Sequence, residues 1–180
     1  MYKTIPIISL LILFFSTASA RENYIYTRIS QKEGLTSTIN SIYKEKDGDV
    51  WLGTPNGLYS FNGHTLRNHQ DSILAGRRVF QTGIDRNGDF WILTNRGPLK
   101  KRGSDLEVVT PSGENDENHP FQCMFQDDEG IWFGSNRRIY RYTFSDSSLT
   151  LFKDLNEQPS FVINSIILLD EHTLLCGSHN

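Results

Sequence analysis

The sequence predicts an all-β protein built from repeated four-stranded antiparallel sheets, and three observations support that prediction. The three tryptophans of the chain, Trp51, Trp91 and Trp132, lie 40 and 41 residues apart. Each of them lies in a short apolar stretch with a turn-forming stretch on either side. The 14 glycines and an aromatic content of 12% favour many short strands and tight turns. A period of about 40–50 residues with short strands is typical of the blades of a β-propeller.

The first repeat shows the pattern most clearly. Apolar residues alternate between turns with Asp-Gly and Asn-Gly signals, which favour hairpins. The strands expected in this repeat are residues 39–43, 50–54, 58–61 and 65–68. Together they predict an antiparallel meander, which is one blade.

Later repeats follow the same order. The second is expected to have strands at residues 79–84, 90–94, 99–102 and 106–109. Those of the third are expected at residues 121–125, 131–135, 139–144 and 149–153. In the second repeat, Pro98 is expected to weaken the early pairing of the third strand.

A fourth repeat begins near residue 161 and stops at Asn180 after its second strand. Aligning Gly177 with Gly134 places Leu175 at the tryptophan position, where we expect leucine to remain buried. Residues 21–180 therefore predict a partial β-propeller of about three and a half blades, which cannot close. Its repeats lie near residues 39–70, 79–110, 120–153 and 161–180. We expect either the N-terminal part of a longer protein or the product of a truncated reading frame.

Residues 1–20 predict a secretory signal peptide. Lys3 supplies a short positive region, residues 5–15 are mostly apolar, and small residues precede a cleavage position after Ala20. The alternative, an uncleaved membrane anchor, would need a longer apolar run of roughly 20 residues. The mature chain is therefore expected outside the cytoplasm.

Two cysteines would then lie in an oxidising compartment. Cys123 and Cys176 fall in different phases of the repeat, so we favour two small buried apolar residues over a disulfide. Neither has the spacing to cysteine or histidine that indicates a metal site. The net charge of −3, without a clustered basic face, gives no electrostatic reason to expect nucleic acid as a partner.

The first repeat resembles the two-component regulator propeller repeat. The resemblance rests on the run from Ile42 to Gly63, with Asp-Gly-Asp, Val-Trp-Leu-Gly-Thr and Asn-Gly-Leu-Tyr in order. The segment at residues 29–36 is similar to the one that opens such sensors. The copies depart from the pattern at Leu93, which replaces a glycine, at residues 96–98, and at residues 137–138, which replace the Asn-Gly-Leu turn.

This resemblance implies the periplasmic sensor part of a hybrid two-component system histidine kinase. Such a protein would be anchored in the inner membrane, recognise carbohydrate fragments and regulate genes for polysaccharide use. Its expected partners are an oligosaccharide, the remaining blades and the C-terminal signalling domains; the sequence leaves a homodimer open. The kinase machinery is absent from these 180 residues, so we expect no enzymatic activity in this chain.

Two sets of residues are predicted to have a role, one in packing and one in ligand binding. The first is structural and packs the blades together: Trp51, Gly53, Gly57, Trp91, Trp132, Gly134, Leu175 and Gly177. The second is a set of ligand-binding candidates, because in a propeller the turns between second and third strands open on the same face as the loops between blades. It comprises Asn56, Asn95, Arg96, Asn136 and Arg137, with Arg77, Arg78 and His119 from the loops between blades. Amide and guanidinium groups suit hydroxyl-rich or uronate ligands.

No catalytic residue, metal ligand or cofactor site is predicted. The turn at residues 85–89 resembles a calcium loop only in part, because Gly88 is misplaced and no closing glutamate follows. The alternative functions are a secreted propeller lyase or hydrolase, and a carbohydrate-binding scaffold without signalling. An enzyme would need acid and base residues clustered on one face, whereas the repeats supply turn carboxylates.

Overall fold

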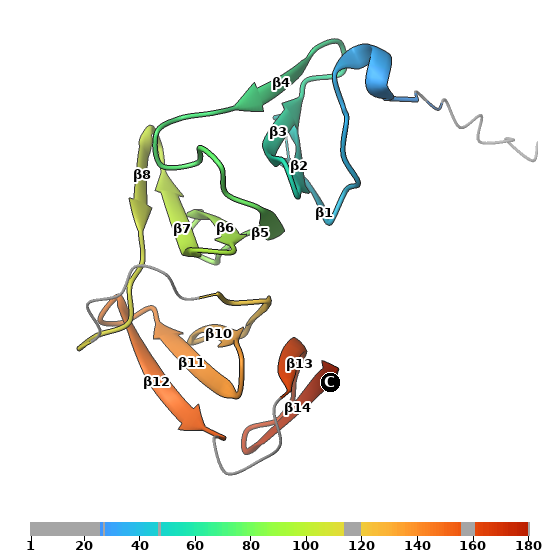
Figure 1. Cartoon of the computed structure of the whole chain (residues 1–180). Helices are drawn as coiled ribbons and strands as arrows, with labels where there is room; N and C mark the ends of the chain where they lie inside the picture. The colour runs from blue at the N-terminus through green and yellow to red at the C-terminus, as the bar shows by residue number, and fades with distance from the viewer. Residues whose placement is uncertain (1–25, 27, 47, 114–119, 156–160, 180) are drawn as a thin grey trace, which may run out of the picture.

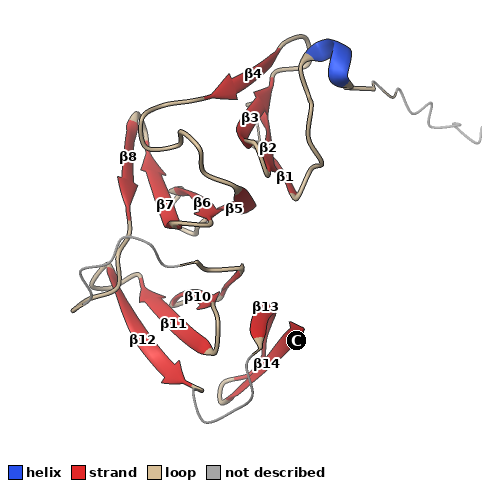
Figure 2. Cartoon of the chain, in the orientation of Figure 1, coloured by secondary structure: helices blue, strands red, loops and turns tan. Residues whose placement is uncertain are grey.

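The structure, a computed structural model, describes residue 26 and residues 28–46, 48–113, 120–155 and 161–179. The predicted signal peptide and its cleavage position after Ala20 lie outside the described residues. Within the described ranges, no helix has both the length and the apolar character needed to cross a membrane. The helix that precedes the sheets is a single 3-10 turn, Gln31–Glu33 (Figure 2).

Three four-stranded antiparallel sheets and one two-stranded sheet follow one another along the chain (Figure 1). The first sheet contains β1 (Ser41–Lys44), β2 (Val50–Thr54), β3 (Gly57–Phe61) and β4 (Leu66–His69). The second contains β5 (Val79–Ile84), β6 (Phe90–Thr94), β7 (Gly97–Arg102) and β8 (Asp105–Val108). The third contains β9 (Cys123–Gln126), β10 (Gly130–Gly134), β11 (Arg138–Thr143) and β12 (Ser148–Asp154). The two-stranded sheet pairs β13 (Val162–Asp170) with β14 (Thr173–His179).

Each four-stranded sheet is a meander whose strands pair in sequence order, as expected for a propeller blade. The sheets are arranged around an open arc, with the first strand of each toward the inside and the last toward the outside (Figure 1). Consecutive inner strands touch: β1 contacts β5, β5 contacts β9, and β9 contacts β13. The prediction of an all-β, incomplete propeller is therefore confirmed.

Side chains on the inner strands link one blade to the next. The Gln81 amide behaves like a strand backbone: its Nε2 donates to the Met124 carbonyl and its Oε1 accepts from the Met124 amide, both at 3.0 Å. Similarly, Asn40 Nδ2 donates to the Val79 carbonyl at 2.7 Å. These bonds satisfy backbone groups at inner strand edges, which would otherwise need water.

Apolar clusters fill the space between consecutive sheets, and each contains one of the three tryptophans. Trp51 packs against Phe90 of the second blade, with ring centroids 5.0 Å apart. Trp91 packs in the same way against Phe133 and Tyr142 of the third blade. In the third cluster, Trp132 packs with two residues of β13 and with both cysteines: Cys123, Ile163, Ile166 and Cys176. Each tryptophan thus packs against the following sheet.

Both cysteine thiols are free, and they lie in the cluster around Trp132. Burial raises the pKa of Cys123 to about 12 and also raises that of Cys176. Because only the thiolate is strongly nucleophilic, these groups act as small apolar side chains.

Glycines two residues after a tryptophan allow the next inner strand to approach closely. A Cβ atom on Gly53 would lie 2.7 Å from Cγ1 of Val79, and one on Gly134 would lie 2.7 Å from Cγ2 of Ile163. In the second blade Leu93 occupies this position and is fully buried. The pairing of β5 with β6 is irregular opposite Leu93, between Val79 and Gln81.

Two details differ from the sequence-based expectations. Pro98 does not delay β7, which begins at Gly97 with Pro98 opposite Leu93. Proline lacks only the donor, and the Pro98 carbonyl still accepts from the Val109 amide at 3.0 Å. Leu175 has the register expected of the tryptophan position, but it is 55% exposed, so its predicted burial is wrong. The earlier tryptophans are covered by the following sheet, and no described element covers Leu175.

Candidate functional site

The turns between second and third strands share one local design in the first two blades. In the first turn, Oγ1 of Thr54 donates to the Gly57 carbonyl at 2.9 Å and accepts from the Asn56 amide at 3.1 Å. The second turn repeats both bonds through Thr94. Gly57 and Gly97 have φ values of 116° and 104°, which only glycine adopts readily. This closed hydroxyl clasp leaves the second turn residue, Asn56 or Arg96, exposed.

These turns lie at the same end of the blades as the loops that enter the next blade. The Asn95 amide donates to the Arg78 carbonyl at 3.1 Å, and Oδ1 of Asn95 accepts from the Arg78 amide at 2.8 Å. In the third blade, the Leu155 amide donates to the Arg137 carbonyl at 2.8 Å. We call this end, with its turns at residues 55–56, 95–96 and 136–137, the turn face.

The predicted binding residues differ in how free their side chains are. Asn56, Arg96 and Asn136 are exposed, whereas Asn95 and Arg137 are half-buried. Asn95 already uses Oδ1 as an acceptor within the fold. The prediction for His119 falls outside the described residues.

Arg77 does not behave as a surface residue. It is 8% exposed, and its Nε donates to the Ile73 carbonyl at 2.6 Å. Its Nη1 donates to Thr94 Oγ1 at 3.2 Å and to the Arg96 carbonyl at 3.0 Å. The structure thus uses Arg77 to hold the turn of the second blade against the loop that precedes that blade.

At the opposite end of the blades, each tryptophan donates its indole N–H to a carboxylate. Trp51 Nε1 donates to Glu45 at 2.9 Å, and Trp91 Nε1 donates to Asp85 Oδ2 at 2.8 Å. In the third blade, Trp132 makes the same contact with Asp127 at 2.7 Å. The sequence pattern of these acidic turns predicts hairpin turns only. The signal that could have revealed this contact is a carboxylate five or six residues before every tryptophan.

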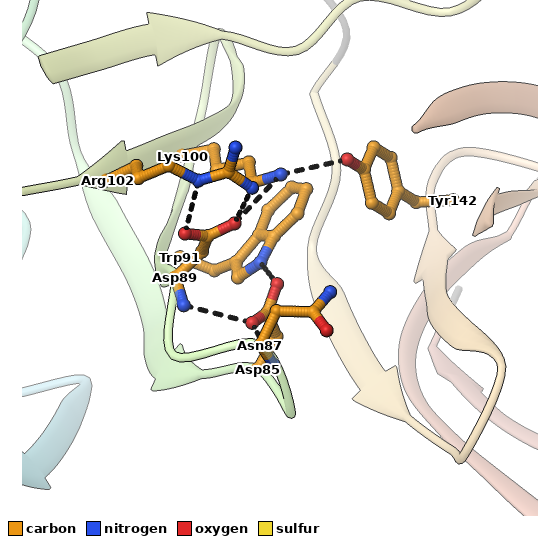
Figure 3. Close-up of polar contacts among 7 residues, drawn as sticks. All are labelled: Asp85, Asn87, Asp89, Trp91, Lys100, Arg102 and Tyr142. Carbon is orange, nitrogen blue, oxygen red and sulfur yellow. Dashed lines mark hydrogen bonds and ion pairs between the residues drawn. The ribbon is translucent and has the colours of Figure 1, made fainter. Parts of the chain in front are cut away.

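The second blade adds a buried ionic network beside Trp91 (Figure 3). Nζ of Lys100 lies 3.0 Å from Asp89 Oδ2 and donates to the Tyr142 hydroxyl of the third blade at 3.0 Å. Arg102 donates two hydrogen bonds to Asp89, from Nε to Oδ1 at 2.8 Å and from Nη2 to Oδ2 at 2.6 Å. Asp89 and Lys100 are 3% and 5% exposed, so this network is an internal link between two blades rather than an open site.

Electrostatics favours the charged form of this network. Hydrogen bonding from Arg102, strengthened by Lys100, lowers the pKa of Asp89 to about 2. Burial opposes the charge of Lys100, but its bonds to Tyr142 and Asp89 outweigh that effect and raise its pKa. In the third blade, burial would raise the pKa of Asp127, but hydrogen bonds from Arg141 and Trp132 prevail and lower it to about 2. Arg141 also lies over the Trp132 ring, 4.2 Å from its centroid.

We expect the protein to lose stability in acid as these two carboxylates become protonated. A carboxyl group whose pKa is lowered by folding stabilises the fold above its ordinary pKa of 3.8. That contribution disappears as the pH falls from about 4 toward about 2. Thermal unfolding followed by circular dichroism at steps of pH should show a falling midpoint in this window, and a smaller fall in Asp89→Asn. A midpoint that is constant from pH 4 to pH 2 would contradict the assignment.

A polar cavity of about 540 Å³ opens near this network, at the end of the blades opposite the turn face. It is lined by Arg86, Asn87, Asp128, Glu129, Thr143, Phe144 and Ser145. Arg86 partly fills it, because its guanidinium donates to the Asp128 carbonyl and lies over the Phe144 ring. In the described part of the chain, no three His, Cys, Asp or Glu side chains are grouped so that they could hold a metal ion.

The three meander blades and their inter-blade tryptophans define the chain as part of a β-propeller. Residues 33–56, which include β1, β2 and the first turn, match the model of the two component regulator propeller family. The chain therefore carries a two component regulator propeller repeat, and the resemblance noted in the sequence is confirmed. A search of curated proteins gave no match to this chain.

Solved structures share the fold at low sequence identity. The extracellular domain of the putative hybrid two component system BT3049 from B. thetaiotaomicron aligns with a TM-score of 0.70 and 20% identity, over 84% of this chain and 23% of that domain. The extracellular domain of the putative hybrid two component system BT4673 from the same organism aligns with a TM-score of 0.66 and 19% identity, over 79% of this chain and 20% of that domain. The virginiamycin B lyase from Staphylococcus aureus aligns with a TM-score of 0.53 and 14% identity, over 78% of this chain and 55% of the lyase. This chain thus spans about a fifth of the two extracellular domains.

Proposed function

We propose that this chain is a ligand-sensing segment of the extracellular, periplasmic part of a hybrid two-component system, and that its ligand is a carbohydrate fragment. The observation that carries the proposal is the recurrence of a polar side chain at one position of the turn face. Asn56, Arg96 and Arg137 each lie two residues after a hydroxyl residue, Thr54, Thr94 or Ser135, at the end of the tryptophan strand. The fold shared with extracellular domains of putative hybrid two component systems supports the same proposal.

The chemistry of these groups suits a ligand rich in hydroxyl groups. An amide offers donors and an acceptor, and a guanidinium offers a planar fork of donors, so both can bind neighbouring hydroxyl or ring oxygens. Because the three turns belong to three blades, one oligosaccharide could bridge residues far apart in sequence. The hydroxyl clasps and Arg77 hold the turn backbones in place, which reduces the entropy lost on binding.

Signalling would follow from differential binding. A ligand that contacts several blades favours the arrangement of domains in which those contacts are best, and it shifts the population toward that arrangement. The remaining blades and C-terminal signalling domains would convert this shift into control of a kinase in the inner membrane. Genes for polysaccharide use are the proposed output.

Calorimetric titration of the purified protein with a panel of oligosaccharides tests the proposal. We expect a bound oligosaccharide whose affinity falls about tenfold or more in the double variant Asn56→Ala/Arg96→Ala, which corresponds to about 1.4 kcal/mol. The matched control is Arg67→Ala, because Arg67 is an exposed arginine on the outermost strand of the first blade. Equal affinities for the double variant and the wild type would refute the role of the turn face. Cleavage of the oligosaccharide by the protein would instead support the lyase or hydrolase alternative.

A further inference from the structure

The third blade departs from the turn design of the first two, and the departure centres on Arg137. Gly57 and Gly97 supply the positive φ in the first two turns, but the equivalent residue in the third blade is Arg138. The positive φ moves one residue earlier, to Arg137, with a value of 56°. A residue with a Cβ atom is disfavoured in this left-handed region. The fold therefore keeps an arginine where glycine or asparagine would be more stable.

One donor of the Arg137 side chain is also left without a partner. Its Nε is buried and has no hydrogen bond, although buried N–H groups are nearly always satisfied. The neighbouring Arg138 differs, because its Nε donates to Asp154 at 3.1 Å. Backbone strain and an unsatisfied charged donor thus coincide at one residue of the turn face.

Charge is distributed unevenly between the two ends of the blades. At the end opposite the turn face, cations are paired: Lys100, which is buried, and Arg102, which is exposed, both pair with Asp89, and Arg141 pairs with Asp127. On the turn face, by contrast, no described carboxylate pairs with Arg78, Arg96 or Arg137. The overall charge of −3 makes unpaired arginines at one end a local feature rather than an effect of composition.

We propose that Arg137 binds an oxyanion of the ligand, namely the carboxylate or sulfate group of an acidic glycan. This proposal rests on the proposed function, since it names the ligand class of the turn face. The Nε and one Nη of a guanidinium form a fork that matches two oxygens of a carboxylate or sulfate. The left-handed backbone at Arg137 fixes where the side chain begins, and a turn of that side chain toward solvent on binding would give the Nε an acceptor. The ligand thereby supplies the acceptor that the described chain lacks.

Galacturonate trimer and its methyl-esterified form are suitable probes, because they differ in charge and share the same ring. We expect the wild-type protein to bind the free acid at least tenfold more tightly than the ester, with a difference that shrinks as salt is added. In Arg137→Gly the preference for the acid over the ester should disappear. Because glycine tolerates the positive φ, the thermal midpoint of this variant should equal or exceed that of the wild type. Arg67→Ala should keep the preference.

Two results would overturn the proposal: equal affinities of the wild type for acid and ester, or an acid preference that survives in Arg137→Gly. A measurement on the wild type alone guards against a variant that fails to fold. In ¹⁵N–¹H spectra, the Nε–H resonance of Arg137 should shift on addition of sodium sulfate but not of sodium chloride at equal ionic strength. An unchanged resonance would also refute the proposal. Binding of neutral oligosaccharides without acid preference would leave the proposed function standing and remove only this inference. A sulfate response without any oligosaccharide binding would refute both the proposed function and the acidic glycan as its ligand.

Discussion

Replacing Trp91 by alanine should remove a large part of the stability of this protein. We expect the free energy of unfolding to fall by about 5 kcal/mol, which is the lower end of the total stability of ordinary domains. Trp91 is 1% exposed, and truncation of a buried tryptophan costs about 3–5 kcal/mol through lost contacts and the cavity that remains. Its indole N–H is also the buried donor to Oδ2 of Asp85, and leaving that buried oxygen unsatisfied adds about 1–3 kcal/mol.

Urea unfolding followed by far-ultraviolet circular dichroism measures this loss without relying on tryptophan fluorescence. The variant Trp91→Phe weights the second contribution, because it removes the donor to Asp85 while it keeps an aromatic ring and loses less volume than alanine. Trp51→Ala and Trp132→Ala should cost less, since both side chains are 8% exposed and rest against fewer buried rings. A loss below about 1.5 kcal/mol for Trp91→Ala would show that the contact between the second and third blades does not depend on this residue.

The order of the strands could be predicted because it depends on local signals. Alternation of apolar residues and the turn chemistry of glycine and asparagine act over a few residues. The strands of each repeat can therefore be predicted from the sequence of that repeat alone. The constant position of the tryptophans indicated packing between blades, and the structure places each of them there. The error at Leu175 has a related cause. Repeat alignment gives the position of a residue on its strand, but burial depends on whether a neighbouring sheet covers it.

The polar contacts could not be predicted because they join residues that the sequence separates. Lys100 and Tyr142 lie 42 residues apart, and their contact depends on how one blade sits against the next. The position of Arg77 in a loop between blades predicts a binding role, yet its donors reach Thr94 and a carbonyl of the next turn. The left-handed conformation of Arg137 could not be predicted because the third turn has no glycine, which is the usual local signal for a positive φ.

Substitution of Gly130 by alanine is the second change for which we expect a large loss, of about 3 kcal/mol. A Cβ atom at Gly130 would lie 1.9 Å from the Tyr142 carbonyl oxygen and 3.0 Å from its carbonyl carbon. The obstacle is backbone, so it cannot move aside as a flexible side chain would. β10 and β11 would have to separate where Gly130 pairs with Thr143. Overpacking of a well-packed interior typically costs 1–3 kcal/mol, and a clash with backbone belongs at the upper end.

The effect should extend beyond the hairpin, because Tyr142 connects the third blade to the second. Its hydroxyl accepts from Lys100, and its ring lies 4.8 Å from that of Trp91. Displacement of β11 at this point therefore disturbs both the buried network and the aromatic cluster. The matched control is Gly83→Ala in β5, where the nearest atom to a new Cβ is Cε of Met124 at 3.6 Å, an ordinary contact. Urea midpoints should place Gly83→Ala within about 0.5 kcal/mol of the wild type. If both alanine variants were equally stable, the close approach of β10 to β11 at Gly130 would be wrong.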